Sequence, residues 1–334
     1  MTDEPLPEVV RRAGVRRVAE LAGVSPATVS RALREGTPVS AGTRERVRRA
    51  AASLGYTLPA RAATVGVLAR FPTRWFFAEA VAGVESVLAV AGHALQLHNV
   101  GDPVGRAHFF ATLPVRGRAD GLIVVASAID DAERAALDEL AVPVVVVGGE
   151  MPGRPRIGID DRAGARAAVQ HLVGLGHAEV ALVSFDPDEA CGQATTRDRR
   201  AGWADALDES GSGRGPVLET GAGVEAGDAA AGELLSLPRL PTAVFAMSDE
   251  AALGLVRTLR RAGVAVPGQV SVIGFDDHEM AAVADLTTIA QPVRRQGELA
   301  AQALLVALDG GEPAGVELPT RLVVRGTTAP PSPR

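Results

Sequence analysis

The sequence predicts a chain of two parts, a small all-α head and a larger α/β body. The head is indicated by an arginine-rich segment before residue 57, in which short helical stretches end at glycines. The body is indicated by apolar runs such as "VGVLA", "GLIVVAS" and "VPVVVVGG" that alternate with amphipathic helical stretches. Strands that helices cover on both faces read as continuous apolar runs, so this alternation predicts parallel sheets between helices.

Composition sets the outer limits. The 334 residues, 47% of them hydrophobic, allow two to three domains with sizeable cores. No apolar segment follows a basic start, and charged residues interrupt every long apolar run, so we expect neither a signal peptide nor a membrane span. The lone Cys191 cannot form an intrachain disulfide, which fits a reducing cytoplasm. We therefore expect a cytoplasmic protein.

The charge is divided unevenly along the chain. Residues 1–62 contain eleven arginines against six acidic residues, a net charge of +5. Because the whole chain carries −6, the remaining residues carry −11. A basic head on an acidic body suggests a polyanionic partner for the head alone, although a solvated helical surface would explain the same charge.

The first helical stretch of the head lies within "RRVAELAGVSPATVSRALREG" and stops at Gly23. A glycine adopts the left-handed conformation without strain, so Gly23 fits the residue directly after a last helical turn. Ser25 followed by Pro26 then predicts an N-cap and the first residue of a second helix, 26–33.

A third helix is expected in "PVSAGTRERVRRAAASLGY", after Gly36 has ended the second one. Ser40 is its expected N-cap, Leu54 lies near its end, and Gly55 stops it. A helix, a glycine turn and a short helix that starts with small polar residues form a helix-turn-helix, here expected within residues 15–56.

These two stretches resemble the DNA-binding head of the lactose/galactose repressor family of bacterial transcriptional regulators. An unrelated three-helix bundle, a partner-binding head and a degenerate head are the alternatives. The resemblance implies that the second helix enters the major groove of operator DNA, where Arg31 is the candidate for a bidentate contact to guanine. The candidate base-facing residues are Pro26, Ala27, Ser30 and Arg31, and the candidate phosphate contacts are Ser25, Thr28, Ser40, Thr43 and Tyr56.

The head departs from the family's pattern in two places. Arg17 stands near the start of the first helix, where the family usually has an acidic residue that suits the helix dipole. Pro26 and Ala27 stand where members often have larger base-reading side chains, so we expect poorer direct readout.

Strands and helices alternate from about residue 65 onward. Strands are expected at 65–69, 94–98, 120–126, 143–148, 156–159, 179–184, 242–246 and 270–274. Helices are expected at 77–91, 104–113, 131–140, 162–175, 199–210, 225–236, 249–262 and 293–309. The series is too long for one sheet, and "IGIDDRAGA" interrupts it midway, which indicates two lobes.

Several stretches of this body resemble the same family: "FFAEAVAGVE", "IGIDDRAGARAAVQHLVGLGH", "RDRRAGWADAL", "PTAVFAMSDEAALGLVRTLRRAGVAVPGQVSVIGFDD" and "LTTIAQPV". The implied fold class is an all-α helix-turn-helix head plus an α/β periplasmic-binding-protein-like body of two doubly wound parallel-sheet lobes. The body, 65–328, would bind a ligand between its lobes and dimerise. Its lobe 1 would comprise 65–159 and 292–318, and its lobe 2 160–290 and 319–328.

Such sheets bind ligands at the strand ends that face the cleft. Position in the family's pattern gives these candidates: Phe76, Asp160, Arg199, Trp203, Asp249, Asp276 and Gln291. Arg199 would donate to sugar hydroxyls or a carboxylate, and Asp276 would accept from hydroxyls. Two alternatives are left open for each of two residues. Trp203 would either stack on a sugar ring or lie in the core, and Asp249 would either contact the ligand or cap a helix.

The cleft also departs from the family's pattern. The stretch "TRWFF" lacks the Asn-Pro that usually precedes the aromatic pair. Gly148 stands where many members have a polar or charged residue, and Ser248 stands where Asn is usual. These exchanges make a sugar pocket of ordinary polarity doubtful.

No catalytic or metal-binding residues are indicated. The six histidines are scattered without a ligand spacing such as H-E-x-x-H. The stretch "GAGVEAG", 221–227, has its last glycine too late for a dinucleotide fingerprint, and Cys191 has no paired histidine in view. We expect no cofactor and no enzyme. An α/β enzyme is the remote alternative, and a free solute-binding protein would need a signal peptide.

Only "TLPARAAT", 57–64, links the head to the first strand. In the family a longer linker contains a hinge helix whose paired leucines wedge into the minor groove. Pro59 disfavours helical geometry at Leu58, so we expect a truncated, extended linker without a stable hinge helix. Arg61 would reach a phosphate or the mouth of the minor groove, or else stay solvated.

The prediction is a sequence-specific, DNA-binding transcriptional regulator, expected to be a repressor. It would bind a palindromic site as a homodimer, with a tetramer left open. A small sugar-like effector would shift the balance between two lobe arrangements and so change operator affinity. The alternative is a diverged member with an altered or lost ligand response or DNA binding. Residues 1–14 are expected to be a flexible extension and 329–334 a disordered tail.

Overall fold

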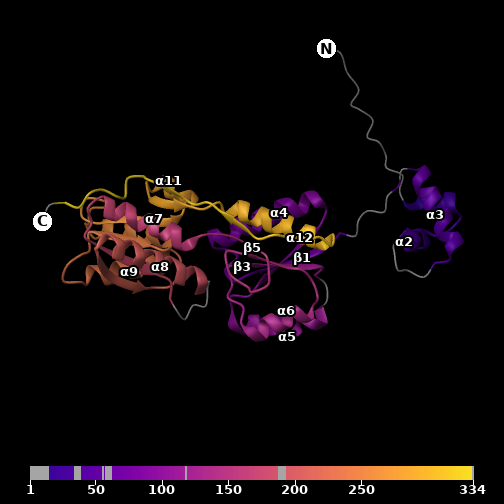
Figure 1. Cartoon of the computed structure of the whole chain (residues 1–334), viewed down its shortest axis with the longest axis horizontal. Coiled ribbons are helices and arrows are strands. Elements are labelled where there is room, and N and C mark those ends of the chain that lie inside the picture. Colours follow the sequence, from indigo (N-terminus) through magenta and orange to yellow (C-terminus); the bar gives the residue numbers. More distant parts are fainter. Residues whose placement is uncertain are drawn as a thin grey trace, which may run out of the picture. The chain divides into compact units, whose positions relative to one another are not determined.

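The computed structural model separates the chain into two compact units, Met1–Ala62 and Ala63–Arg334, which we call the head and the body (Figure 1). The structure describes residues 15–33, 39–54, 56, 62–116, 119–186 and 193–332. The expected extension 1–14, the linker residues 57–61 with Leu58, Pro59 and Arg61, and Cys191 lie outside the described residues.

The described head consists of α1 (Val15–Ala22), α2 (Pro26–Leu33) and α3 (Ala41–Ser53). Each helix contributes one fully buried valine, Val18, Val29 or Val47, and alanines fill the space around them. Gly23 has φ +66° after the last turn of α1, which is the left-handed conformation expected there.

Two serine caps fix where α2 and α3 begin. The backbone N–H of Thr28 donates to Ser25 Oγ at 3.1 Å, and the N–H of Thr43 donates to Ser40 Oγ at 3.3 Å. Each bond satisfies an N–H group that has no partner inside its helix and is worth about 1 kcal/mol. The predicted starts of both helices are therefore confirmed.

The described part of the body forms two six-stranded sheets, one in each lobe. The first-lobe sheet has the order β11-β5-β4-β3-β1-β2, and all of its strands are parallel. Its strands are β1 (Thr64–Ala69), β2 (Ala94–Asn99), β3 (Gly121–Val125), β4 (Val144–Val147), β5 (Arg156–Ile159) and β11 (Val316–Leu318).

The second-lobe sheet has the order β12-β10-β9-β8-β6-β7 and is parallel except for β12 at its edge. Its strands are β6 (Glu179–Ser184), β7 (Gly213–Glu219), β8 (Ala243–Ala246), β9 (Ser271–Asp276), β10 (Thr287–Ala290) and β12 (Arg321–Val323). Two parallel sheets with helical crossovers confirm the fold class predicted for the body.

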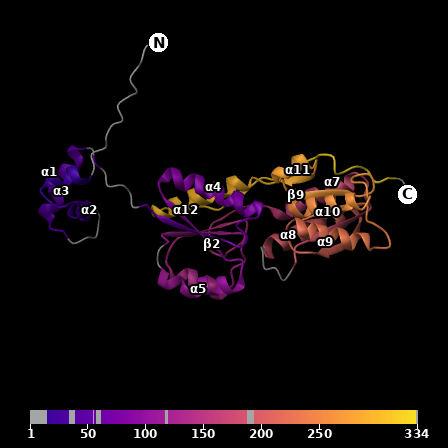
Figure 2. The same cartoon turned by 180° about the vertical axis from the view of Figure 1, so that it is seen from behind.

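Helices cover both faces of each sheet (Figures 1 and 2). In the first lobe, α4 (Trp75–Ala91) and α12 (Val293–Leu308) cover one face, and α5 (Pro103–Arg116) and α6 (Asp131–Glu139) cover the other. In the second lobe, α7 (Asp161–Gly174) and α8 (Gln193–Ser210) lie opposite α9 (Val224–Leu235) and α10 (Asp249–Arg261). The short α11 (Glu279–Val283) follows β9.

The structure adds elements that the sequence analysis did not identify: β7, β10, β11, β12 and α11. The strands β11 and β12 have three residues each and are only partly buried. The strand β10 is buried, but it has four residues, two of them threonine. None of these strands has the long apolar run that reveals a buried parallel strand.

The chain end differs from the expected disordered tail. Ser271 Oγ donates to the carbonyl oxygen of Ala329 at 2.9 Å, and the N–H of Ala329 donates back to Ser271 Oγ at 3.0 Å. Ser332 Oγ donates to the carbonyl oxygen of Gly268 at 2.7 Å. These bonds tie residues 329–332 to the second lobe.

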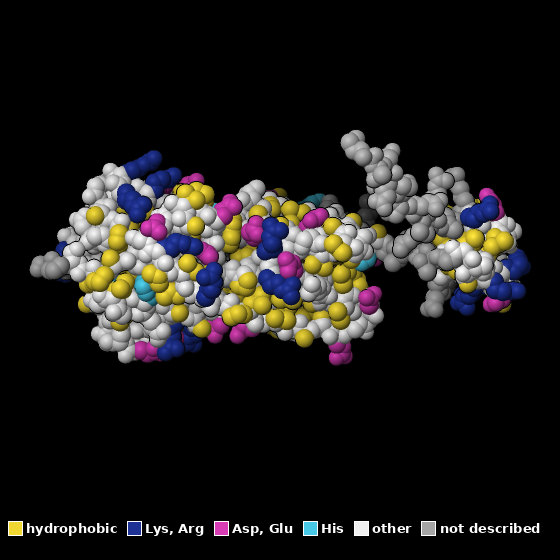
Figure 3. All heavy atoms as spheres, turned by 90° about the horizontal axis from the view of Figure 1, so that it is seen from above, with side chains coloured by type: hydrophobic (Ala, Val, Ile, Leu, Met, Phe, Trp, Pro, Cys, Tyr) yellow, Lys and Arg dark blue, Asp and Glu magenta, His cyan; other side chains and the backbone are white. Residues whose placement is uncertain are grey.

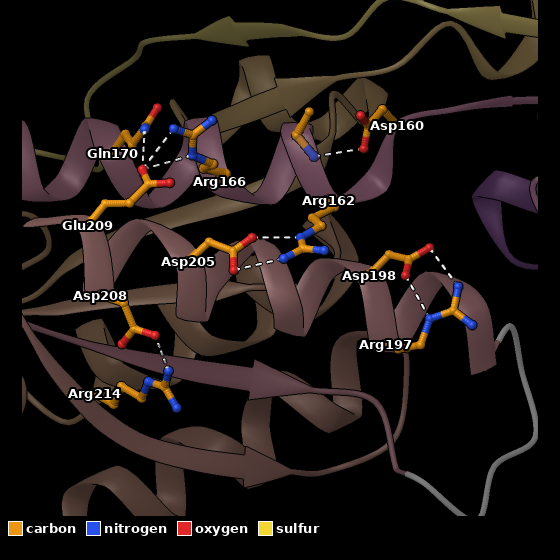
Figure 4. A network of polar contacts seen from close by, with 11 residues as sticks. Asp160, Arg162, Arg166, Gln170, Arg197, Asp198, Asp205, Asp208, Glu209 and Arg214 are labelled. Atoms are coloured by element: carbon orange, nitrogen blue, oxygen red, sulfur yellow. Dashed lines mark hydrogen bonds and ion pairs between the residues drawn. The ribbon is translucent and has the colours of Figure 1, made fainter.

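The helices α7 and α8 pack so closely that one position between them admits only glycine. A Cβ atom on Gly202 of α8 would lie 2.2 Å from the carbonyl oxygen of Arg162 in α7. On the outer side of this pair, Arg162 forms a bidentate ion pair with Asp205 at 2.6 and 2.9 Å, and Arg166 pairs with Glu209 at 2.8 Å (Figure 4). Exposed pairs contribute only about 0–1 kcal/mol each, so the contact between α7 and α8 depends mainly on the close packing at Gly202.

We predict that Gly202→Ala lowers the free energy of unfolding of the body by about 1–3 kcal/mol, because the added methyl group must displace helix backbone. Gly232→Ala in α9 is the control, since a Cβ there meets nothing within 4 Å. It should be neutral or stabilise by up to about 1 kcal/mol, because alanine favours helix. Both tryptophans, Trp75 and Trp203, lie in the body, so urea unfolding followed by tryptophan fluorescence reports on this unit. Equal stabilities of the two variants would contradict the packing argument.

Candidate functional site

The first candidate site is the amino-terminal half of α2 in the head. Pro26, Ala27 and Arg31 are exposed there, as a surface that contacts DNA bases requires. Arg31 Nε donates to the carbonyl oxygen of Ala27 at 3.4 Å, one turn earlier in the helix. The side chain of Ser30, the fourth predicted base-facing residue, lies outside the described part of the head.

Pairs of hydroxyl groups lie at two helix starts of the head. Ser25 Oγ and Thr28 Oγ1 are 2.8 Å apart at the start of α2, and Ser40 Oγ donates to Thr43 Oγ1 at 2.9 Å at the start of α3. Helix starts present free N–H groups and the positive end of the dipole, so both positions suit phosphate. Tyr56, the fifth predicted phosphate contact, is half-buried against the core of the head.

Arg46 adds a cation beside the second hydroxyl pair. Its Nη2 donates to Thr43 Oγ1 at 3.5 Å. Arg46 was not among the predicted DNA contacts. Residues three apart on a helix lie on one face, so its spacing from Thr43 could have indicated it. Arginine side chains gather on the surface of the head seen in Figure 3.

The second candidate site is a cavity between the two lobes of the body, with a volume of about 760 Å³ including its opening to solvent. Its walls come largely from the carboxyl ends of strands in both sheets, where parallel sheets bind ligands. The lining residues are Phe71, Arg74, Phe76, Phe77, Ala126, Gly148, Ile159, Asp161, Phe185, Thr195, Arg199, Ala222, Ser248, Glu250, Asp276, Gln291 and Gln296. Phe76, Arg199, Asp276 and Gln291 are the predicted residues among them.

Arg199, on α8, is the centre of a buried polar network. The residue is 4% exposed, and its Nε donates to Asp161 Oδ1 at 2.8 Å while its Nη1 donates to the carbonyl oxygen of Met247. Nη1 also lies 3.7 Å from Asp276 Oδ1, and the guanidinium stacks 3.6 Å from the centre of the Phe275 ring. A buried guanidinium is tolerated only when it is paired and hydrogen-bonded in this way.

The network continues from Asp276 through two amide side chains. Gln291 Nε2 donates to Asp276 Oδ1 at 2.6 Å, and Gln296 Nε2 donates to Gln291 Oε1 at 2.9 Å. Burial raises the pKa of Asp276 to about 6, although the Arg199 guanidinium and the bond from Gln291 oppose the shift. Burial likewise raises the pKa of Asp161, with Arg199 again opposing. The ionic state of the cavity wall therefore depends on pairing with Arg199.

Backbone strain is found at the same strand ends. Asp276 has φ +128° and Ala126 has φ +40°, values that residues with a side chain rarely adopt. Each costs about 1–3 kcal/mol and persists only where the surroundings hold it. Both residues line the cavity, which is where such strain is expected at a functional site.

Aromatic side chains from both lobes also line the cavity. Phe71, Phe76 and Phe77 contribute from the first lobe and Phe185 from the second. Gly148 has φ +63°, and a Cβ atom there would lie 2.9 Å from Cζ of Phe76. Glycine at this position therefore leaves room for the Phe76 ring, where the family's pattern has a polar side chain.

Two residues predicted for the cavity lie elsewhere. Trp203 is 4% exposed within the second-lobe core, where its Nε1 donates to the carbonyl oxygen of Val180 at 3.1 Å. Asp160 is exposed and caps α7 by accepting from the N–H of Ala163 at 2.8 Å. The core alternative for Trp203 is the correct one.

Asp249 is fully buried at the start of α10 and also does not line the cavity. It accepts hydrogen bonds from Thr288 Oγ1 at 2.6 Å and from the N–H of His278 at 2.8 Å. The N-cap of α10 is Ser248, so Asp249, predicted as a ligand contact with a helix cap as the alternative, is neither part of the cavity lining nor the cap of this helix. Burial, together with the Asp276 carboxylate, raises the pKa of Asp249 to about 8.

Several polar lining residues were not among the predicted ones: Arg74, Asp161, Thr195, Glu250 and Gln296. Asp161 directly follows Asp160 in "IGIDDRAGA", so the signal lay in the same motif. Within the described residues, no group of three or more His, Cys, Asp or Glu side chains is placed to hold a metal ion. No described helix is long and apolar enough to cross a membrane.

Comparison with known proteins identifies both parts of the chain. Residues 15–58 match the profile of bacterial regulatory proteins of the lacI family, and residues 169–328 match the periplasmic binding protein-like domain. The HTH-type transcriptional repressor PurR of Vibrio atlanticus is 32% identical over 308 residues, which cover 88% of this chain and 91% of PurR.

Solved structures give the same result. The complex of the transcriptional regulator CelR with cellobiose is 31% identical and has a TM-score of 0.71, covering 95% of this chain and 100% of that one. The lac repressor dimer bound to operator and the anti-inducer ONPF is 28% identical, with a TM-score of 0.74 and coverage of 96% and 100%. The resemblance drawn from the sequence is confirmed, and this chain belongs to the lacI family of bacterial regulatory proteins, which are transcriptional regulators and not enzymes.

Proposed function

We propose that this protein is a transcriptional repressor whose affinity for operator DNA is controlled by a small, sugar-like ligand between the lobes of its body. The observation that carries the proposal is the cavity, which is lined both by the buried network around Arg199 and by the Phe76 ring. Related proteins support it, because PurR is a repressor and CelR forms a complex with cellobiose. The lac repressor dimer bound to operator supports a homodimer. We further propose that this dimer acts on palindromic DNA in the cytoplasm.

The cavity offers the two kinds of contact that a sugar needs. A sugar ring has hydroxyl groups at its edge and an apolar face. Asp276 and Gln291 supply acceptors and donors for hydroxyl groups, and Phe76 supplies a flat apolar surface. Arg199 holds Asp276 in place, because its guanidinium lies 3.7 Å from the carboxylate.

The ligand would act by favouring one arrangement of the lobes. Described contacts between the lobes near the cavity include the rings of Trp75 and His278, 5.1 Å apart, and the bond from Thr195 Oγ1 to the carbonyl oxygen of Gly148 at 3.2 Å. An ion pair between Arg197 and Glu150 at 3.5 Å adds to them. A ligand that touches both lobes adds contacts only when the lobes are close together. Because the ligand binds the closed arrangement more tightly than the open one, it increases the fraction of molecules in the closed arrangement.

We predict that Arg31→Ala weakens binding to operator DNA by about 1–3 kcal/mol and relaxes preference at one base pair per half-site, because a bidentate guanine contact is lost. Arg46→Ala is the comparison, since Arg46 lies beside a phosphate-type hydroxyl pair. Arg46→Ala should weaken binding to operator and random DNA alike. It should also lower by about 1 the magnitude of the slope of log K against log salt concentration. Fluorescence anisotropy at several salt concentrations measures both effects. An Arg31→Ala loss that is equal on operator and random DNA would exclude base readout.

We predict that Asp276→Asn weakens sugar binding by about 1–3 kcal/mol, because the ligand's hydroxyl and the Gln291 amide lose an ionised acceptor. Trp203→Phe should leave affinity unchanged, since Trp203 lies in the core and not in the cavity. A thermal-shift screen of mono- and disaccharides, beginning with cellobiose, identifies the sugar, and calorimetry gives Kd for the three proteins. Unchanged affinity in Asp276→Asn would place the binding site outside this cavity.

The buried carboxyl groups predict how stability depends on pH. Burial raises the pKa of Asp249 to about 8 and that of Asp276 to about 6, both above the ordinary value of 3.8. Between about pH 4 and about pH 8 the folded body therefore retains protons that the unfolded chain has released. The free energy of unfolding should fall by on the order of a few kcal/mol across this range and level off above it. Urea unfolding at a series of pH values measures this dependence. The free energy of unfolding of Asp249→Asn should change less with pH than that of the unmodified protein. Parallel pH profiles of the two proteins would contradict the raised pKa of Asp249.

A further inference from the structure

Two arginines lie close to one aromatic ring at the cavity wall of the first lobe. The guanidinium carbons of Arg70 and Arg74 lie 5.3 and 4.5 Å from the centre of the Phe71 ring. Phe71 and Arg74 line the cavity. Arg70 Nε and Nη1 and Arg74 Nη1 are buried and have no hydrogen-bond partner among the described residues. A buried N–H without an acceptor has given up its hydration without compensation, so these atoms are suited to receive an acceptor.

The charges that line the cavity are divided between the lobes. Asp161, Glu250 and Asp276 all belong to the second lobe, together with Arg199, which pairs with two of them. Arg74 is the charged lining residue of the first lobe within the described chain. No described carboxylate forms an ion pair with it, whereas the second-lobe wall has an excess of negative charge.

The Arg74 guanidinium also lies at the boundary with the second lobe. A Cβ atom on Gly223 would be 3.7 Å from Cζ of Arg74. Gly223 is the N-cap of α9 and offers no side-chain acceptor to the first N–H groups of that helix. Glu225 also lies beside Gly223, but it makes no ion pair with Arg74 among the described contacts. The Glu225 carboxylate opposes the positive potential of the helix start, so Arg74 itself is the charge that would hold an anion here.

Gln296 adds a requirement for a hydrogen-bond donor in the ligand. The residue is fully buried and lines the cavity, and its Oε1 has no partner in the described structure. Its Nε2 is already used in the bond to Gln291, so the free oxygen accepts a hydrogen bond from whatever occupies the cavity. Hydroxyl groups are such donors.

We propose that the effector is a polyhydroxylated anion, a sugar that carries a carboxylate or a phosphate, and that Arg74 receives its anionic group. This inference rests on the function proposed above, because it specifies the ligand of the same cavity. Hydroxyl groups bind at Gln296, Gln291 and Asp276, while the anion binds the guanidinium of the first lobe through charge-assisted bonds. Such a ligand contacts opposite charges on the two lobes and so favours their closure.

The test compares three probes that differ only at one carbon: glucose, glucuronate and glucose 6-phosphate. Calorimetry on the full chain should show at least one charged probe binding at least about tenfold more tightly than glucose, with the advantage falling as salt rises. The better of the two charged probes distinguishes a sugar acid from a sugar phosphate. Arg74→Gln should remove the advantage and leave glucose affinity within about twofold. Arg295→Gln, which changes an exposed arginine paired with Glu298 in α12, should have no effect.

Arg74→Lys is the second variant, because it keeps the charge but loses the planar fork; it should retain part of the preference. The inference is wrong if glucose binds as tightly as both charged probes, if none of the three binds, or if Arg74→Gln keeps the preference. Operator binding measured on the same preparations separates the two proposals. If the protein binds operator DNA and responds to neutral sugars alone, the proposal of an anionic effector is wrong, and the proposed repressor function is still supported. A protein that binds no operator DNA contradicts the repressor function itself.

Discussion

The pairing of one buried guanidinium constrains most of the second lobe. Arg199 is nearly inaccessible to solvent, so its charge has to be compensated by groups that the fold delivers from several elements. Asp161 comes from the first turn of α7, Asp276 from the end of β9, and the Met247 carbonyl from the end of β8. The close packing of α7 against α8 at Gly202 is what brings the guanidinium within reach of these acceptors. A shift of α8 would leave a buried charge uncompensated, so the geometry of the cavity wall and the stability of the lobe are linked.

The same network reaches the other lobe. From Asp276 it passes through Gln291, in the segment that joins β10 to α12, and ends at Gln296 on α12 of the first lobe. A ligand that binds Asp276 therefore acts on a polar chain that runs along a connection between the lobes. Because each amide both donates and accepts, a change at the carboxylate alters which oxygen along the chain stays free. The arrangement of the lobes can therefore respond, through this chain of hydrogen bonds, to a ligand in the cavity.

Local signals were enough to predict the head and the type of fold. Gly23, Ser25 and Ser40 act on their immediate neighbours, so their role as helix stop and caps can be recognised in the sequence. Strands with long apolar runs were found for the same reason. Short strands such as β11 and β12 were missed because what stabilises them is their place beside another strand, which the local sequence does not show.

The candidate cavity could be predicted only in part, because neighbouring residues have different environments. Asp160 and Asp161 are adjacent, yet one caps a helix in solvent and the other pairs with Arg199. Arg199 and Trp203 lie one turn apart on the buried side of α8, and that single turn separates the cavity from the core. Whether a side chain lines the cavity or lies in the core depends on where its helix ends relative to the sheet. The local sequence pattern does not indicate that position. The motifs could be identified from the sequence, but how deeply each side chain is buried became known only from the fold.

The charge distribution of the chain explains how one protein could bind two anions at different places. The body carries −11 and the head +5, so at long range the body repels DNA phosphates and the head attracts them. At physiological ionic strength this repulsion is screened beyond about 8 Å, so a small anion in the cavity responds mainly to the charges nearest to it. Arg70 and Arg74, which have no described carboxylate partner, provide a local positive potential inside an acidic domain. If the proposed anionic effector binds there, polymeric and small anions would be directed to separate sites by the range over which each site's charge acts.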